Sequence, residues 1–291
     1  TILGEDAAGK VVEVGSKLKH KFHVGQRIMA HTLGIGQGSA FGGFQMYPVV
    51  NPATAAAIPD DVSFAEAAVL PLSISTAAAG LFTKVALRLV CPTPESATAE
   101  PPLKSKQKAT VLVWGGSSSV GSSCIQLAAA AGYKVITTAS PSNYTYCKDL
   151  GASLVLDYHN PDVVLILIGL MRGMNVIGAY DAIGTQTTGR QCATIIHFLR
   201  GGRVATVGSA PDIYRNVKIV RISSGHIVTE EPDVAEKIWG KYVPWALKEG
   251  KLKPSPAALV AGKGLDSVQA GLDRQRAGVS AKKVVIELQC K

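Results

Sequence analysis

A glycine- and serine-rich turn is the first feature of this sequence that could do chemistry. Residues 115–121, GGSSSVG, follow the fully apolar run 111–114 and open a helical run that continues to Ala131. After a buried strand and at the start of a helix, free backbone N–H groups and the helix dipole attract a pyrophosphate. Serine replaces the middle glycine of the standard G-x-G-x-x-G pattern, but serine hydroxyls can also donate to phosphate oxygens.

The same residues would suit an ordinary βα turn with a serine cap. The βα units that follow the turn favour dinucleotide binding over that interpretation. The predicted pyrophosphate-binding residues are Gly116, Ser117, Ser118, Ser119, Val120 and Gly121.

The end of the next strand indicates which dinucleotide binds. An NAD site usually carries an acid about 20 residues past the glycines, where it grips the ribose 2′-hydroxyl. Here that strand ends in residues 138–143, TASPSN, and the first acid beyond it is Asp149. The sequence therefore predicts NADPH rather than NADH, although the same segment also suits a helix N-cap. The candidate groups around a 2′-phosphate are Ser140, Ser142, Asn143 and Tyr158, with Lys148 as a further charge.

Metal chemistry has little support. A zinc-dependent alcohol dehydrogenase needs thiolate and imidazole ligands, and a structural zinc needs closely spaced cysteines. The chain has no C-x-x-C pattern, and its five cysteines are scattered. Of its six histidines only His20 and His23 have anything like ligand spacing, and no cysteine is near them. We therefore expect no metal site.

Other catalytic patterns are absent or misplaced. Tyr144 and Lys148 match the Tyr-x-x-x-Lys pair of short-chain dehydrogenases. They lie on the helix after the second strand, where they would flank the adenosine end, so we interpret the match as a coincidence. No G-x-S-x-G elbow or Walker lysine occurs.

Composition limits the class of protein. The chain has 291 residues, 47% hydrophobic and 18% charged, with a formal charge of +9. This content excludes a disordered polymer. The one dense basic cluster follows the Pro-rich stretch 92–102, so we interpret it as a solvated linker rather than a nucleic-acid site. That cluster consists of Lys104, Lys106 and Lys108.

The sequence also limits the location. No apolar run reaches the roughly 18 residues that a membrane span needs, and Thr1 opens a strand-like segment without a basic leader. An odd number of scattered cysteines indicates a reducing compartment. We therefore expect a cytoplasmic protein with neither a membrane nor a nucleic-acid partner.

The elements around the glycine turn form two patterns. From Thr110 onward, apolar strands alternate with helical runs, which predicts βαβ units and a doubly wound parallel sheet. The first 70 residues instead suggest the short strands and glycine turns of a partly open barrel. The predicted strands are 10–14, 27–30, 44–50, 111–114, 134–139, 153–157, 176–181, 203–207 and 283–288; helices are predicted after the glycine turn and at 61–70, 143–150, 163–172, 186–200 and 265–276.

Several segments together resemble the medium-chain dehydrogenase/reductase superfamily. Residues 4–15, GEDAAGKVVEVG, look like the signature that opens its catalytic domain, and residues 70–77 look like its crossing to the cofactor domain. Residues 24–28 and 278–285 resemble a further turn and the final strand. Within the superfamily the chain is most similar to the zinc-independent enoyl reductase and quinone oxidoreductase branch, close to fungal trans-acting enoyl reductases.

The resemblance implies an α/β fold in two domains. A Rossmann domain, with a doubly wound parallel sheet, is expected over 73–251, and a smaller GroES-like catalytic domain, a partly open β-barrel, over 1–72 and 252–291. Because the family's chains begin some tens of residues earlier, the resemblance also implies an N-terminally truncated chain. Residues 163–171 are more apolar than the amphipathic helix expected there, which indicates deeper burial or an interface.

The resemblance further implies an NADPH-dependent transfer of hydride to an activated double bond. The expected substrate is a small molecule, a 2-enoyl thioester or a quinone, and a polyketide synthase is an expected partner. A quinone oxidoreductase and a non-catalytic NADPH-binding scaffold are the alternatives, and a homodimer and a monomer both stay open. Segments 32–44 and 224–245 are expected to line the pocket. By resemblance, Thr76 and Tyr47 are the candidate catalytic residues, and Gly184 and Val207 complete the cofactor-binding set.

Overall fold

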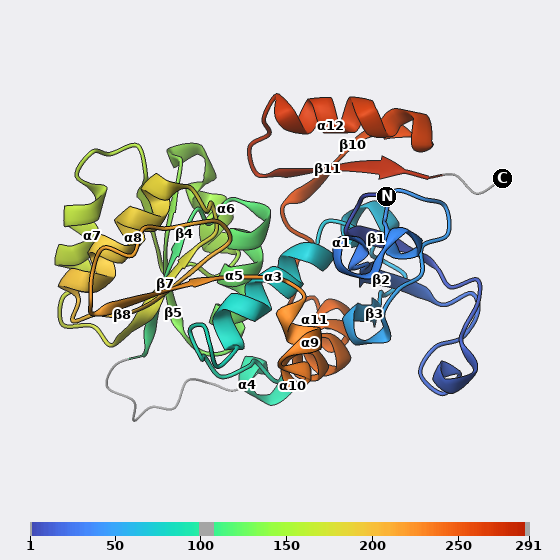
Figure 1. The fold of residues 1–291 in the computed structure, drawn as a ribbon, viewed down its shortest axis with the longest axis horizontal. Coiled ribbons are helices and arrows are strands. Elements are labelled where there is room, and N and C mark those ends of the chain that lie inside the picture. Colours follow the sequence, from blue (N-terminus) through green and yellow to red (C-terminus); the bar gives the residue numbers. More distant parts are fainter. Residues whose placement is uncertain (1, 99–107, 289–291) are drawn as a thin grey trace.

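A six-stranded parallel sheet forms the larger half of the molecule. The computed structural model describes residues 2–98 and 108–288 (Figure 1). The strand order, β6-β5-β4-β7-β8-β9, reverses direction beside β4, as in a Rossmann sheet. This confirms the predicted fold class. The strands are β4 (Thr110–Trp114), β5 (Lys134–Ala139), β6 (Leu154–Asp157), β7 (Val176–Asp181), β8 (Gly202–Thr206) and β9 (Val217–Arg221).

Helices cover both faces of this sheet, because the strand side chains alternate between two apolar clusters. In β4, Val111 and Val113 belong to one cluster, while Leu112 and Trp114 belong to the other. The first cluster includes α5 (Ser119–Ala130) and the end of α6 (Tyr144–Asp149). The second includes α7 (Val163–Met171) and α8 (Gln186–Phe198). A strand buried on both faces is what a covered parallel sheet requires.

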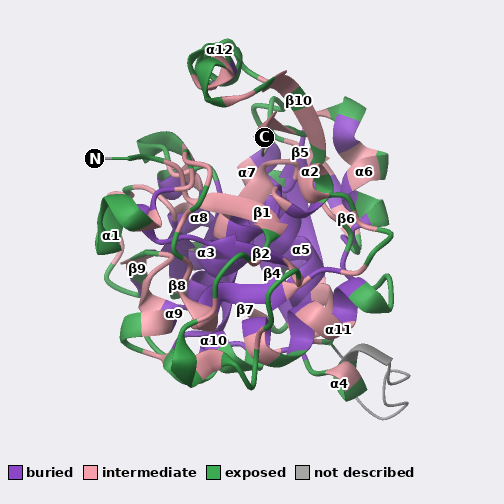
Figure 2. Ribbon diagram, turned by 90° about the vertical axis from the view of Figure 1, so that its right-hand side faces the viewer, coloured by how far each residue is buried: buried purple, intermediate pink, exposed green. Residues whose placement is uncertain are grey.

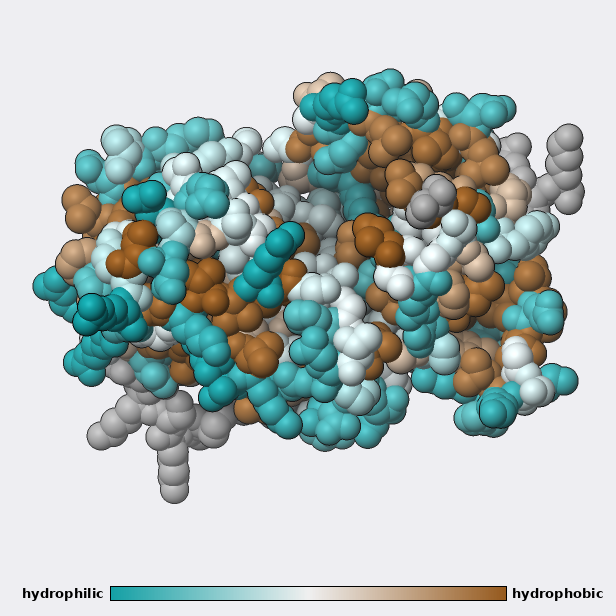
Figure 3. All heavy atoms as spheres, in the orientation of Figure 1, coloured by the Kyte–Doolittle hydropathy of each residue, from teal (hydrophilic) through white to brown (hydrophobic). Residues whose placement is uncertain are grey.

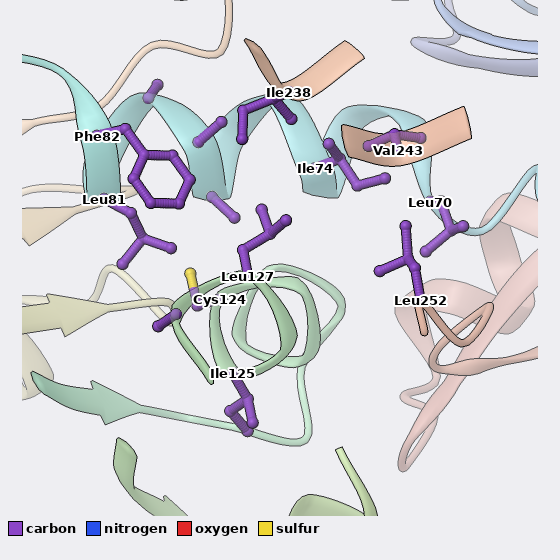
Figure 4. Packing of buried hydrophobic residues seen from close by; sticks show 14 of the residues in the cluster. Leu70, Ile74, Leu81, Phe82, Cys124, Ile125, Leu127, Ile238, Val243 and Leu252 are labelled. Atoms are coloured by element: carbon purple, nitrogen blue, oxygen red, sulfur yellow. The ribbon is translucent and has the colours of Figure 1, made fainter. Parts of the chain in front are cut away.

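Helix α3 (Pro71–Phe82) lies at the centre of the molecule. Except for Leu72, every residue in it is buried. Figure 4 shows α3 packed on α5, with Ile238 and Val243 approaching from the C-terminal helices η5 (Glu236–Tyr242) and α11 (Val243–Lys248). Its polar side chains are paired across these contacts: the Ser73 and Ser123 hydroxyls lie 2.8 Å apart, and Trp239 Nε1 donates to Ser75 Oγ at 3.1 Å.

By length and composition, one stretch of the described chain is apolar enough to cross a membrane. It runs over Phe64–Phe82, 19 residues with a mean hydropathy of 1.4. It contains Glu66, so it is not a continuous apolar run. Of its window, 72% is buried inside the fold, and a core helix passes the same test.

The strands of the smaller half differ in burial. Strands β1 (Asp6–Lys10), β2 (Arg27–His31) and β3 (Ala55–Ala57) form an antiparallel sheet, while β10 (Ala257–Lys263) and β11 (Lys282–Glu287) pair in parallel under α12 (Val268–Arg276). Of these, β2 and β3 are mostly buried, and the other strands are partly buried or exposed. Figure 2 shows the buried residues gathered in the larger half and α3, with β10 and α12 mostly half-buried or exposed. Figure 3 shows apolar side chains over this β10–β11–α12 unit, separated from the larger half by a recess.

Several predicted elements of the smaller half are wrong. The first strand ends at Lys10 instead of covering 10–14, and residues 44–50 form no strand. Residues 44–50 are held by isolated backbone hydrogen bonds and not by a continuous ladder. Phe44 N–H donates to Leu3 O at 2.8 Å, and Val49 N–H donates to Ala40 O at 2.8 Å. Helix 61–70 shrinks to α2 (Phe64–Ala67), which a Ser63–Glu66 capping box starts.

The sequence analysis also missed elements. Strands β9 and β10 and helix α3 were not predicted, and the segment 224–245 is largely helical. The η5 segment is a π-helix that ends beside Pro244. Proline has no N–H to bond to Gly240, four residues back, and its ring crowds that carbonyl, which accounts for the wider turn. The short elements are α1 (Gly34–Gln37), α4 (Pro94–Thr98), α9 (His226–Thr229), α10 (Pro232–Ala235) and 3₁₀ turns at Ser16–Leu18, Ser39–Phe41, Pro52–Thr54, Pro141–Asn143 and Leu265–Ser267.

The central position of α3 yields a stability prediction. A Cβ at Gly80 would lie 2.2 Å from Cε2 of Tyr180, a fully buried ring whose hydroxyl donates to Thr76 O at 2.7 Å. We expect Gly80→Ala to lower the free energy of unfolding by about 1–3 kcal/mol. Gly169→Ala, in α7 with open space around it, is the matched control and should raise stability by roughly 0.5–1 kcal/mol. Urea denaturation of both variants measures this, and equal effects would contradict it.

Candidate functional site

The glycine turn joins β4 to α5 through a fixed set of backbone bonds. Gly115 has a φ of +81°, and its carbonyl accepts from Ser118 N–H at 3.0 Å. Gly116 N–H donates to Thr138 O in the next strand at 2.9 Å. Ser118 is the N-cap of α5, since its Oγ accepts from Gly121 N–H at 3.0 Å. The predicted strand–turn–helix arrangement is therefore present.

Only glycine fits at two positions of this turn. A Cβ on Gly121 would lie 2.2 Å from Gly115 O, and one on Gly116 would lie 2.2 Å from Thr137 Oγ1. The first turn of α5 thus rests directly on the backbone at the end of β4. This contact places the start of the helix at the carboxyl edge of the sheet, beside the point where the strand order reverses.

The turn offers unpaired donors. Within the described chain, the backbone N–H groups of Ser117, Ser119 and Val120 make no hydrogen bond. Ser119 Oγ is buried and has no partner either. Buried polar groups are almost always satisfied, so an orphaned hydroxyl among free N–H groups indicates an acceptor that binds there. A pyrophosphate fits this set of donors.

The predicted 2′-phosphate residues lie together at the end of β5. Ser140 and Ser142 have hydroxyls 3.3 Å apart, and Asn143 Nδ2 donates to Ser140 Oγ at 3.1 Å. Asn143 Nδ2 also donates at 3.0 Å to Ser280, just before β11, so the smaller half borders this corner. Tyr158 is 44% exposed.

One acid lies at this corner, at the end of β6. The register of β5 and β6 sets Asp157 opposite Ala139. Its Oδ1 accepts from His159 N–H at 2.9 Å and lies 2.8 Å from His159 Nδ1. These bonds lower the pKa of Asp157. One oxygen of the Asp157 carboxylate is therefore held by hydrogen bonds from His159, two residues along the chain.

A second acid organises the ends of β7 and β8. Asp181 is fully buried; its Oδ1 accepts from the N–H groups of Ile183 and Gly184 at 3.1 and 3.0 Å, and its Oδ2 accepts from the hydroxyls of Thr188 and Thr206 at 3.1 and 3.0 Å. The sequence analysis missed it, because its partners lie on other elements. It fixes the turn that carries Gly184.

The other two cofactor candidates lie at the same strand ends. Gly184 has a φ of +77°, and its backbone touches Gly208 so closely that neither position has room for a Cβ. Val207 N–H donates to Asp181 O at 3.1 Å. Val207 therefore lies directly after β8, next to Gly208 in the chain and beside its contact with Gly184.

The two candidate catalytic residues are not brought together by any contact in the described ranges. Thr76 is 9% exposed, and its hydroxyl donates to Leu72 O at 2.7 Å inside α3. Tyr47 is 60% exposed and lies in an irregular segment. Thr76 is linked to the sheet through its carbonyl, which accepts from Tyr180.

The side chains present do not fit a metal ion. Among the residues that the structure describes, no group of three or more His, Cys, Asp or Glu side chains could hold one. Burial raises the pKa of the Cys91 and Cys147 thiols to about 11, so neither supplies a thiolate near neutral pH.

Two hollows lie away from the glycine turn. One, of about 150 Å³, is lined by Gln126 and Tyr242 among others. The other, of about 360 Å³, lies between Ile58 and Trp245. The second hollow is lined in part by Pro244 and Trp245, which belong to the predicted pocket segment 224–245.

Known proteins are similar to this chain over nearly its whole length. The family model described as "Zinc-binding dehydrogenase" matches residues 119–249. The chain is 37% identical to dehydrogenase pigH of Monascus ruber, covering 99% of this chain and 83% of that protein. It is 36% identical to trans-enoyl reductase himH of Aspergillus japonicus, covering 99% and 81%.

Solved structures share the fold. Quinone oxidoreductase of Escherichia coli, crystallised with NADPH, aligns with a TM-score of 0.72 and 21% identity over 98% of this chain and 82% of that one. The CurK enoyl reductase aligns with a TM-score of 0.71 and 19% identity over 99% and 80%. At these identities the likeness concerns the fold alone.

The four bonds of Asp181 yield a prediction. Asp181→Asn replaces one of the two accepting oxygens by an NH₂ group. That group would face N–H or O–H donors that the carboxylate oxygen now accepts from. We expect the free energy of unfolding to fall by about 2–4 kcal/mol, and the amides of Ile183 and Gly184 to exchange faster with deuterium. Asp212→Asn, at an exposed position, is the control and should change neither. Unaltered exchange in Asp181→Asn would show that the carboxylate does not hold this turn.

Proposed function

Because this chain belongs to the medium-chain dehydrogenase/reductase superfamily and is an oxidoreductase, we propose that it uses NADPH to reduce an activated carbon–carbon double bond. The glycine turn carries the proposal: free N–H groups at Ser117, Ser119 and Val120 surround the orphaned, buried Ser119 hydroxyl. This set of donors suits a pyrophosphate at the start of α5.

Two observations support NADPH over NADH. Ser140, Ser142 and Asn143 gather hydroxyl and amide groups at the end of β5. The quinone oxidoreductase of Escherichia coli, which shares the fold, was crystallised with NADPH.

The roles of this chain's own residues follow from their positions. The glycine turn would hold the pyrophosphate, and the strand-end turns at Gly184 and Val207 would border the cofactor between the two halves. When bound, the dinucleotide supplies hydride to the electrophilic carbon of the substrate. Thr76 would position the substrate end of the site from the buried helix α3. No step is assigned to a metal ion, because the described side chains do not fit one.

We propose a 2-enoyl thioester as the substrate, because relatives such as himH of Aspergillus japonicus are named trans-enoyl reductases. A quinone is the second candidate, favoured by the structural likeness to quinone oxidoreductases. A cytoplasmic location, a polyketide synthase partner, and the choice between monomer and homodimer stay predictions.

Calorimetric titration tests the cofactor. We expect NADPH to bind at least about tenfold more tightly than NADH, because one hydrogen bond to the charged 2′-phosphate contributes about 1.5–3 kcal/mol. Gly121→Ala should weaken NADPH binding at least roughly tenfold, about 1.4 kcal/mol, since its Cβ meets Gly115 O. Gly169→Ala is the matched control. Equal affinities for the two dinucleotides would refute the assignment of the β5 corner.

A substrate panel separates the remaining candidates. Saturable NADPH oxidation with 2-enoyl thioesters supports the proposal, and oxidation with quinones alone supports the second candidate. Tight NADPH binding without turnover on either would mean a non-catalytic scaffold.

A further inference from the structure

A buried histidine in the smaller half contacts a carboxylate. His31, at the end of β2, is fully buried, and its Nε2 lies 3.1 Å from Oε2 of Glu5. The other carboxylate oxygen, Glu5 Oε1, accepts from Ile35 N–H at 2.8 Å. The carbonyl of His31 accepts from the Thr54 hydroxyl at 2.9 Å. Both partners are therefore held in place by neighbouring elements.

The remaining ring nitrogen has no partner. His31 Nδ1 is buried and makes no hydrogen bond in the described structure. An unsatisfied buried polar atom is unfavourable by about 1–3 kcal/mol, and such atoms concentrate where function requires them. The Glu5 side chain is 14% exposed, whereas that of His31 is 0% exposed, so the pair reaches solvent through its carboxylate.

The pair lies close to the cofactor half. Asp6, the next residue in the chain, accepts from Leu72 N–H in the first turn of α3 at 2.6 Å. The following residue, Ser73, bonds to Ser123 of α5, the helix that begins at the glycine turn. The first turn of α3 therefore links β1, which begins directly after Glu5, to the helix that starts at the candidate pyrophosphate site.

The charges around the pair are few. Asp6 Oδ2 lies 2.7 Å from Lys283 Nζ of β11, so these two charges offset each other. From the 3₁₀ turn Pro52–Thr54 and from α1, the hydrogen bonds to the pair within the described residues come from the neutral Thr54 hydroxyl and the Ile35 N–H. The pKa of Glu5 is lowered overall: burial raises it, and the bonds from His31 and Ile35 outweigh that effect. The carboxylate is thus ionised beside the ring at neutral pH.

Resting on the proposed function, we propose that Glu5 and His31 are the proton-donating pair of the reaction. Hydride addition breaks the π bond and leaves an electron pair at the carbon next to the carbonyl. Glu5 Oε2 passes the proton that it shares with His31 Nε2, 3.1 Å away, to that carbon, where the new C–H bond forms. Water then returns a proton to the pair through the exposed edge of Glu5.

The closing experiment compares Glu5→Gln and His31→Gln with His197→Gln. His197, near the end of α8, also contacts a polar side chain, with its Nδ1 2.7 Å from Asn216 Oδ1, but in an exposed contact outside the expected pocket segments. NADPH affinity is measured by calorimetry, and turnover on 2-enoyl thioesters is measured against pH. In D₂O, a substrate with a 2-methyl group reports the configuration at the protonated carbon.

We expect Glu5→Gln and His31→Gln to lower kcat about 100-fold, with NADPH affinity unchanged within about twofold. Deuterium should enter from both faces in Glu5→Gln. His197→Gln should match the unsubstituted protein.

The outcomes distinguish the two proposals. If NADPH binds and Glu5→Gln keeps the wild-type kcat, pH profile and product configuration, the pair is not the donor and the proposed function stands. If the unsubstituted protein does not bind NADPH, the proposed function fails and the role of the pair fails with it. Should His31→Gln not fold, Glu5→Gln, at a partly exposed side chain, decides alone.

Discussion

The backbone contact between Gly121 and Gly115 is the constraint on which the rest of this structure depends. It allows α5 to start directly at the end of β4, leaving N–H groups free and one serine hydroxyl without a partner. The same seating of α5 sets the surface against which α3 packs (Figure 4). Because α3 in turn bonds to Asp6, the residue after Glu5, the candidate phosphate site and the candidate proton source are positioned by one chain of contacts.

The larger half was predictable because its signals are local. Strands such as 134–139 and 176–181 match the structure residue for residue, since each is a short apolar run between turn residues. The smaller half was predicted less well, because β1, β10 and β11 are only partly buried and the strands of its first sheet lie far apart in the chain. Residues 44–50 contain strand-forming types, yet bond to the chain near Leu3 by isolated contacts. Helix α3 was missed because it is apolar on all sides and shows no helical periodicity.

The site shows the same difference between features with a local sequence signal and features formed by distant residues. The glycine turn could be found from a contiguous pattern, and the structure adds the orphaned Ser119 hydroxyl that no pattern reveals. Asp157 becomes a neighbour of the β5 end only through the sheet register. Glu5 and His31 lie 26 residues apart and meet because β1 and β2 are antiparallel. Nothing in the spacing of the histidines indicated this contact.

Helix α3 has a mechanical consequence. It is bonded at its start to Asp6 of the smaller half and along its length to Tyr180 of the sheet, and Arg203 donates to the carbonyls of Lys84, Val85 and Ala86 just beyond its end. A rod fastened to both bodies cannot act as a flexible tether. We therefore expect α3 to limit how far the two halves can separate as reactants enter and products leave.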